Sequence, residues 1–226
     1  MALVLNLETA TTNCSVSISE NDKTIFLKEN NAVEYSHSEQ LHVFIEDVLK
    51  EASLSFSDFD AVAVSKGPGS YTGLRIGVSA AKGLCFSLDI PLISVPTLQS
   101  MARQVKLGEN EISIPVLDAR RMEVYSAVYD AGYKEIRETR AEIIDEDSFK
   151  EFAVYDKVYI VGSGAKKCNE ILECPNFEFD ASLTPSANEM ASIAYEKYQK
   201  QQFEDVAYFE PYYLKDFVLQ GKKTNP

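Results

Sequence analysis

The sequence predicts an α/β fold of two similar lobes, because one order of strands, helix and glycine-containing turn occurs twice along the chain. Segments with the apolar or alternating pattern of strands open each copy, at 3–8, 14–19 and 23–29 and again at 112–118, 123–130 and 133–144. An acidic residue ends the first strand of each copy, at Glu8 and at Asp118. We therefore expect an N-terminal lobe at 1–107 and a C-terminal lobe with a tail at 108–226, facing one another across a cleft.

A helix over 36–52 is predicted after the first three strands. Ser36 and Glu39 have the spacing of a capping box, in which each side chain bonds the other residue's amide. Behind this box, apolar residues recur at helical spacing, with charged residues on the opposite face. The apolar stripe consists of Leu41, Phe44, Ile45, Val48 and Leu49. This pattern predicts an amphipathic helix with one covered face.

A strand at 60–65 leads through the segment KGPGSYTG into a second helix, predicted over 74–88. Arg75 and Lys82 are its only charged residues, so the helix is apolar on nearly every side. Such a helix is covered either by its own lobe or by another chain. We predict that it forms a docking face together with helix 36–52; the alternative is that both are ordinary core helices. The residues predicted to contact a partner are His37, Leu41, Phe44, Ile45, Val48, Leu49, Leu74, Arg75, Val78, Ala81, Lys82 and Cys85.

The segment KGPGSYTG at 66–73 lies between a strand and a helix, where backbone amides and the helix dipole attract anions. Its glycines are spaced one residue off the dinucleotide-binding pattern, and it lacks the ending of a P-loop. Glu8 is followed by threonines, and in some duplicated-lobe enzymes a turn of this composition binds phosphate. Threonines also cap ordinary turns by bonding to nearby backbone. Anion binding and a tight structural turn both stay open at this point. The residues assigned to a remnant nucleotide site are Glu8, Thr11, Thr12, Gly67, Gly69 and Asp118.

The histidines and cysteines predict no metal site and no cofactor. His37 and His42 are five residues apart, so on a helix they point about 140° away from each other. The four cysteines form no C-x-x-C pair, and no serine or cysteine sits in a nucleophile motif. The residue pattern therefore predicts a protein without catalytic machinery of its own.

The charge balance argues against direct binding of nucleic acid. There are 22 Lys and Arg residues and 35 Asp and Glu residues, a net charge of 22 − 35 = −13. A protein that grips nucleic acid needs a basic face, so this chain is expected to reach RNA only through another protein. No apolar run is long enough to cross a bilayer, and the N-terminus has no basic leader. We expect a cytoplasmic protein that contacts no membrane.

Four segments together resemble the TsaB family, bacterial components of tRNA threonylcarbamoyladenosine synthesis. They are LNLETATTNCSVSI, KGPGSYTGLRIGVSAAKGL, PVLDARRMEVYSAVY and PYYLK. The resemblance implies duplicated RNase H-like lobes of the acetate-kinase, actin and chaperone-ATPase type. It also implies that helices 36–52 and 74–88 dock on TsaD. That paralogue transfers a threonylcarbamoyl group to the adenosine adjacent to the anticodon of ANN-decoding tRNAs, and TsaE joins the larger complex.

The departures from TsaD imply a scaffold and activator rather than a second enzyme. Where TsaD carries a metal-binding His-x-x-x-His, this chain has Thr97 and Met101, neither of which replaces an imidazole on a metal. Two alternatives stay open. One is an ATP-dependent phosphotransferase or ATPase of the same fold, which would use Glu8, Thr11 and Asp118. The other is a homodimer through the same docking face when TsaD is absent.

Overall fold

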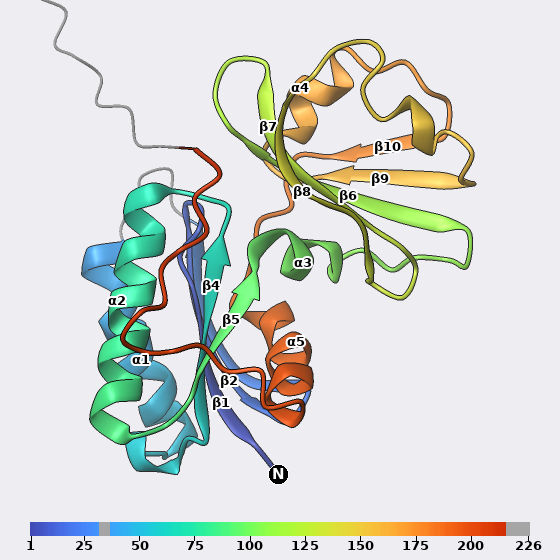
Figure 1. Cartoon of the computed structure of the whole chain (residues 1–226). Coiled ribbons are helices and arrows are strands. Elements are labelled where there is room, and N and C mark those ends of the chain that lie inside the picture. The colour runs from blue at the N-terminus through green and yellow to red at the C-terminus, as the bar shows by residue number, and fades with distance from the viewer. Residues whose placement is uncertain (32–36, 216–226) are drawn as a thin grey trace, which may run out of the picture.

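The computed structural model describes residues 1–31 and 37–215, which form two α/β lobes (Figure 1). The strands of the first lobe are β1 (Leu3–Glu8), β2 (Asn13–Glu20), β3 (Lys23–Asn31), β4 (Ala61–Gly67) and β5 (Leu92–Pro96). Those of the second are β6 (Glu111–Asp118), β7 (Glu123–Tyr129), β8 (Glu135–Ile143), β9 (Lys157–Val161) and β10 (Phe177–Asp180). The predicted cap at Ser36 and the end of the predicted tail lie outside the described residues.

Both sheets have the same strand order and the same strand directions. The first sheet has the order β3-β2-β1-β4-β5, and the second has the order β8-β7-β6-β9-β10. In each sheet the first three strands of the chain pair antiparallel as a meander, and the remaining two add parallel to the opposite side. This shared connectivity confirms the duplicated α/β fold that the repeated pattern predicts.

Helices cover both faces of the first sheet. Helices α1 (His37–Ala52) and α2 (Tyr71–Leu88) pack on one face, and α5 (Ala187–Gln199) packs on the other. Successive residues of β1 point to opposite faces, so Leu5 meets α1 and α2 whereas Val4 meets α5. Because both faces are covered, the strand is buried from Val4 to Glu8, and its sequence is apolar apart from Asn6 and Glu8.

Two helices pack on the lobe that is formed by the other half of the sequence. Helix α3 (Thr97–Ala102) follows the last strand of the first sheet, yet Leu98 and Met101 pack against Leu117 and Tyr129 of the second lobe. In the opposite direction, α5 follows the second sheet and packs on the first. The remaining helices are α4 (Ala165–Asn169) and the single turns Phe56–Asp58 and Lys150–Phe152. Two connections therefore cross between the lobes, one through α3 and one leading to α5.

The segment after α5 also lies on the first lobe, although the sequence analysis grouped the tail with the second. It runs back beside β5, β4 and α2 toward the gap between the lobes, as the red coil in Figure 1 shows. Glu204 pairs with Leu92 of β5, and the amide of Tyr212 donates to the carbonyl of Lys66 at the end of β4, 2.7 Å away. The tail is therefore a structural part of the first lobe as far as the structure describes it.

Helix α2 begins at Tyr71, three residues before the start predicted at 74. The Ser70 hydroxyl accepts a hydrogen bond from the amide of Gly73 at 3.2 Å and so caps the helix. The Ser70 amide in turn donates to the carbonyl of Ala10 at 2.6 Å. The helix start therefore lies directly on the turn between β1 and β2. The prediction missed this first turn because it took the glycine-rich segment as a loop.

Two glycines of α2 have opposite surroundings, one in close contact with backbone and one at an open surface, so alanine at each should have opposite effects on stability. A Cβ at Gly73 would lie 2.2 Å from the carbonyl oxygen of Thr9, whereas a Cβ at Gly83 would meet nothing within 4 Å. Gly73→Ala forces the helix away from the turn, so we expect it to lower the free energy of unfolding by about 1–3 kcal/mol. Gly83→Ala in the same helix is the control, with an expected gain of about 0.5–1 kcal/mol. Urea unfolding of both variants measures this, and equal effects would contradict the close packing.

Candidate partner-docking site

Most side chains predicted to contact a partner are buried in the core of their own lobe. The buried ones are His37, Leu41, Ile45, Val48, Leu49, Leu74, Val78, Ala81 and Cys85. The apolar residues of this set that belong to α1 pack with Leu5, Val16 and Val64 of the sheet. The expectation that this stripe faces another chain is therefore wrong. The physical reason is that the sheet of the same lobe already removes the stripe from water.

The other three predicted residues keep some exposure. Phe44 is half-buried and packs at the edge of the same core. Lys82 is also half-buried, and its ammonium donates to the carbonyls of Ala207 at 3.1 Å and Phe209 at 3.0 Å. Arg75 is exposed; its guanidinium lies 5.1 Å from the centre of the Tyr71 ring and donates to the Tyr71 hydroxyl at 2.9 Å. Arg75 alone of the predicted set lines an outward surface.

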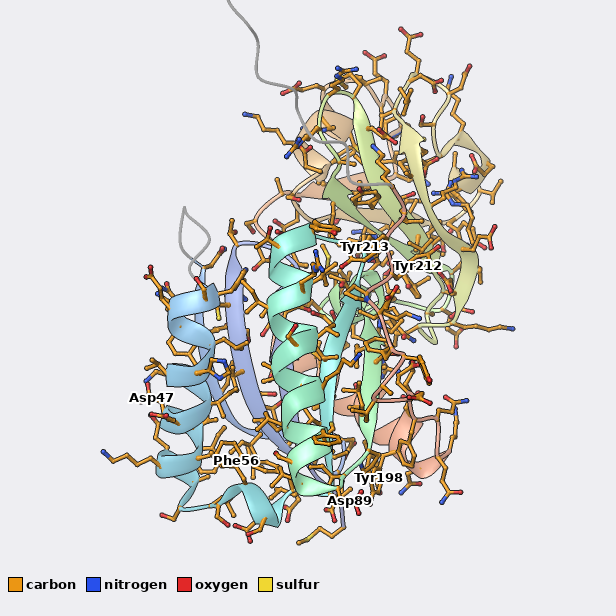
Figure 2. All side chains as sticks on the ribbon, turned by 60° about the vertical axis from the view of Figure 1, so that its left-hand side comes forward. Asp47, Phe56, Asp89, Tyr198, Tyr212 and Tyr213 are labelled. Atoms are coloured by element: carbon orange, nitrogen blue, oxygen red, sulfur yellow. The ribbon has the colours of Figure 1, made fainter. Side chains whose placement is uncertain are left out.

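An open groove of about 760 Å³ lies on the outer side of the two helices, away from the sheet. Figure 2 shows α1 and α2 side by side on this face of the first lobe. The groove is lined by Ser38, His42, Tyr71, Thr72, Arg75, Ile76, Ser79, Ala80, Gly83 and Leu84. Eight of these ten residues belong to α2. The outward face of α2, rather than the apolar stripe of α1, is therefore the main candidate docking surface.

The floor of the groove is made of small side chains. Ser79, Ala80 and Gly83 leave the backbone of α2 accessible, and the space above Gly83 is open. Small residues at such positions let a second helix approach closely, because the distance between helix axes depends on the side chains at the contact. Phe86 lies one turn beyond Gly83 on the same side of α2 and is 85% exposed. An accessible helix backbone next to an exposed aromatic ring is suited to protein contact.

Sequence reasoning missed the groove residues other than Arg75, although one signal was present. Ser79, Ala80 and Gly83 recur at spacings of three and four residues on α2, on the side opposite Leu74 and Val78. That spacing marks a helix face that carries small side chains. The prediction instead followed the larger apolar side chains, which have the stronger periodic signal and pack inward.

His37 links the start of α1 to the turn after β1. Its Nε2 lies 2.6 Å from the carbonyl oxygen of Thr11, and the ring is buried. Burial lowers the pKa of the imidazole, because it disfavours the charged form, and the Thr11 carbonyl opposes this effect only in part. His37 therefore holds local structure together and offers no surface to a partner.

The residues assigned to a remnant nucleotide site are engaged in turns of the chain itself. Thr12 donates to the side chain of Asn31 at 2.8 Å, and the Thr11 hydroxyl accepts from the amide of Asn13 at 3.4 Å. Gly67 and Gly69 approach other backbone so closely that a Cβ would lie 2.8 Å from Tyr212 O and 2.4 Å from Ala10 O, respectively. These contacts are those of a tight structural turn. Asp118 lies in the second lobe, paired at 3.0 Å with Lys167.

Glu8 is the most unusual ionisable group in this region. It is completely buried at the end of β1, where its Oε1 accepts from the Ala10 amide at 2.6 Å and from the Ser65 hydroxyl at 2.9 Å. Its Oε2 has no hydrogen-bond partner among the described residues. Burial raises the pKa of the carboxyl to about 7, against the lowering effect of the hydrogen bonds from Ala10 and Ser65. This carboxyl is therefore partly protonated near neutral pH.

The described residues hold no obvious centre for metal chemistry. Within residues 1–31 and 37–215, no three side chains of His, Cys, Asp or Glu gather closely enough to bind a metal ion. Thr97 and Met101 are buried at the start of α3 and between the lobes.

No helix within residues 1–31 and 37–215 combines the length and apolar character needed to cross a membrane.

Known proteins resemble this chain over nearly its whole length. A family model described as TsaD, tRNA N6-adenosine threonylcarbamoyltransferase, matches residues 31–224. The tRNA threonylcarbamoyladenosine biosynthesis protein TsaB of Escherichia coli is 30% identical, with 97% of each chain covered. TsaB of Haemophilus influenzae is 28% identical over 97% of this chain and 96% of its own length. The solved structure of YeaZ from Pseudomonas aeruginosa superposes with a TM-score of 0.80 at 25% identity, covering 95% of this chain and all of that one.

The buried carboxyl of Glu8 predicts a pH dependence of stability. Its pKa is about 7 in the folded chain and 4.5, the ordinary value, in the unfolded chain. The folded state therefore holds the proton more tightly, and the free energy of unfolding falls as the pH rises from about 4.5 through 7. Glu8→Gln keeps an acceptor for Ala10 and Ser65 without the charge. The native chain should lose on the order of 3 kcal/mol of its free energy of unfolding over this pH range, and we expect Glu8→Gln to remove that loss.

Urea unfolding at pH 5 and pH 8 measures this difference. The native chain should lose more stability than Glu8→Gln between the two pH values. Asp118→Asn, at an exposed carboxylate, is the control and should keep the pH dependence of the native chain. Parallel pH profiles for the native chain and Glu8→Gln would show that Glu8 does not titrate in this range.

Proposed function

The chain belongs to the TsaB family of tRNA threonylcarbamoyladenosine biosynthesis proteins, within the wider group that the TsaD family model describes, and we propose that it acts as the non-catalytic partner of TsaD. In this role it binds TsaD in the cytoplasm and supports transfer of the threonylcarbamoyl group to the adenosine next to the anticodon of ANN-decoding tRNAs. TsaE joins the larger complex. The observation that carries the proposal is the outward groove of α1 and α2, with its accessible helix backbone and exposed Phe86.

A partner of related fold suits this groove. The TsaD family model matches most of this chain, so TsaD is expected to present a pair of helices corresponding to α1 and α2. Two such pairs can pack face to face around a pseudo-twofold axis, with the small residues of α2 at the centre of the contact. Arg75 and the Tyr71 ring lie at one end of the groove and Phe86 lies beyond the other, so residue types that dominate interface energies flank the centre.

The contacts of the remnant nucleotide site support a scaffold rather than an enzyme. The turn after β1 is filled by its own hydrogen bonds, and the segment at 66–69 is covered by Tyr212. The net charge of −13 disfavours direct binding of tRNA by this chain, so the tRNA is bound through the complex. The chain contributes a rigid surface on which the catalytic subunit is held.

Self-association is the second candidate role, favoured by the exposure of Phe86 and Val43 in the isolated chain. The same groove on two copies forms a self-complementary contact around a twofold axis. Because TsaD and a second copy would use one surface, they would compete. Sedimentation velocity of the chain alone and with TsaD separates the two assemblies.

The groove predicts that Ser79→Arg abolishes binding to TsaD. Ser79 is exposed on the groove floor, so a long charged side chain blocks close helix approach without entering the core. We expect the affinity to fall by at least about a hundredfold, as for a residue at the centre of an interface. Calorimetric titration of the purified chain with TsaD measures the affinity, and tRNA modification by the mixture should fall in parallel.

Ser57→Arg is the matched control, because Ser57 is exposed and does not line the groove. It should bind TsaD like the native chain. Aspartate at Leu41 or Val78 would not test docking, because both side chains are buried and the charge would disrupt the core. Native affinity of Ser79→Arg would exclude this groove as the docking site.

The enzyme alternative makes a different prediction about the isolated chain. A phosphotransferase or ATPase using Glu8, Thr11 and Asp118 would bind ATP with magnesium and hydrolyse it. Because the candidate phosphate loop is covered and Glu8 is completely buried, we expect neither binding heat nor phosphate release. Calorimetry and a phosphate-release assay at pH 7 measure both. Hydrolysis that Glu8→Gln or Asp118→Asn abolishes would favour the enzyme.

A further inference from the structure

The chain after α5 forms an extended segment, residues 204–215, which we call the C-terminal strap. It begins at the edge of the first sheet, where the Glu204 amide donates to the carbonyl of Leu92 at 2.9 Å and the Glu204 carboxylate accepts from the Ser94 hydroxyl. Val206 and Phe209 pack against the core under α1 and α2. The strap is thus built into the first lobe at its start, although it has almost no regular secondary structure.

A lysine of α2 holds the middle of the strap. The Lys82 ammonium donates to the carbonyls of Ala207 and Phe209, at 3.1 and 3.0 Å. Two carbonyls on one ammonium fix the local course of the strap. Lys82, which the sequence predicts to contact a partner, therefore binds the strap of its own chain.

The strap then crosses the segment that follows β4. The Tyr212 amide donates to the Lys66 carbonyl at 2.7 Å, and the Tyr212 carbonyl oxygen lies 2.8 Å from where a Cβ of Gly67 would be. Gly67 also has a φ of +110°, which side-chain-bearing residues rarely adopt. Glycine at this position therefore lets the strap lie directly on the loop.

The end of the strap reaches the second lobe. The Lys215 ammonium pairs with the carboxylate of Glu123 and lies 5.7 Å from the centre of the Tyr125 ring. Both partners belong to β7, whereas the earlier contacts of the strap are with the first lobe. The strap therefore ties the two lobes together without a covalent crossing.

We propose that the C-terminal strap is an interlobe latch, which the pair of Lys215 and Glu123 holds closed. The two covalent crossings, through α3 and into α5, define a line about which the lobes can swing. The strap end is a further attachment, separate from both crossings: it lies over the loop after β4 and beside the first turn of α2, and Lys215 reaches β7. This third attachment between the lobes opposes the swing. This proposal does not depend on the partner-docking function.

The latch also touches the docking groove. The Tyr213 ring lies 4.9 Å from the ring of Tyr71, centre to centre, and Tyr71 in turn accepts a hydrogen bond from Arg75. Tyr71 and Arg75 both line the groove, and Tyr212 and Tyr213 lie beside the upper part of α2 in Figure 2. Release of the strap would therefore free the side chains at one end of the groove as well as the lobes.

A charge exchange tests the latch in the isolated full-length chain. Lys215→Glu and Glu123→Lys each place like charges together, and the double variant restores an opposite pair. Each single variant should raise amide exchange in the strap roughly two- to fivefold, the effect of one partly exposed ion pair on a local opening equilibrium. Small-angle scattering should show an increased radius of gyration. The double variant should return both quantities to the native values.

Lys150→Glu is the control, because Lys150 pairs with Asp147 inside the second lobe and does not contact the strap. It should leave strap exchange and the radius of gyration unchanged. The latch is overturned if both single variants show the amide exchange of the native chain in the strap. It is also overturned if the double variant keeps the raised exchange and radius of gyration of the single variants. Since neither readout uses TsaD, failure of the docking proposal would leave this result unaffected.

Discussion

The close contact between α2 and the turn after β1 is the constraint on which the rest of the molecule depends. Gly73 and Gly77 leave no room for a side chain above Thr9, and the Ser70 amide bonds the carbonyl of Ala10. The helix is thereby fixed at one height and one rotation on the sheet. That rotation turns Leu74 and Val78 toward the sheet and leaves the small side chains at 79, 80 and 83 in the groove, so the core and the groove have a common origin.

The same contact explains why a turn with the residues of an anion site is closed. The first turn of α2 covers it from one side, the buried Glu8 lies against it within the sheet, and the strap covers the neighbouring loop through Tyr212. Amides that could receive a phosphate instead bond to carbonyls and a carboxylate of the same chain. The turn is therefore closed by contacts within the chain itself. A closed turn of this kind suits the proposed scaffold role.

The proposed scaffold role depends instead on the outer surface of the first lobe. On α2 the small side chains of Ser79, Ala80 and Gly83 form a shallow groove, with Arg75 and Tyr71 at one end and Phe86 beyond the other. The strap connects this groove to the second lobe through Tyr213 and Lys215. The surface, the helix and the interlobe contact are therefore parts of one continuous packing arrangement. A change in the angle between the lobes is expected to reach the docking surface along it.

The sequence by itself determined the two-lobed α/β fold and the family, because strand and helix periods are visible in side-chain polarity and the motifs are contiguous. Only the tertiary structure decided which helix face meets water. Leu41 and Val78 look the same in sequence whether a sheet of their own lobe or another chain covers them, since the hydrophobic effect depends on the area removed from water and not on what removes it. The strap contacts were hidden for a related reason. Lys215 and Glu123 are 92 residues apart, and only the folded chain brings them together.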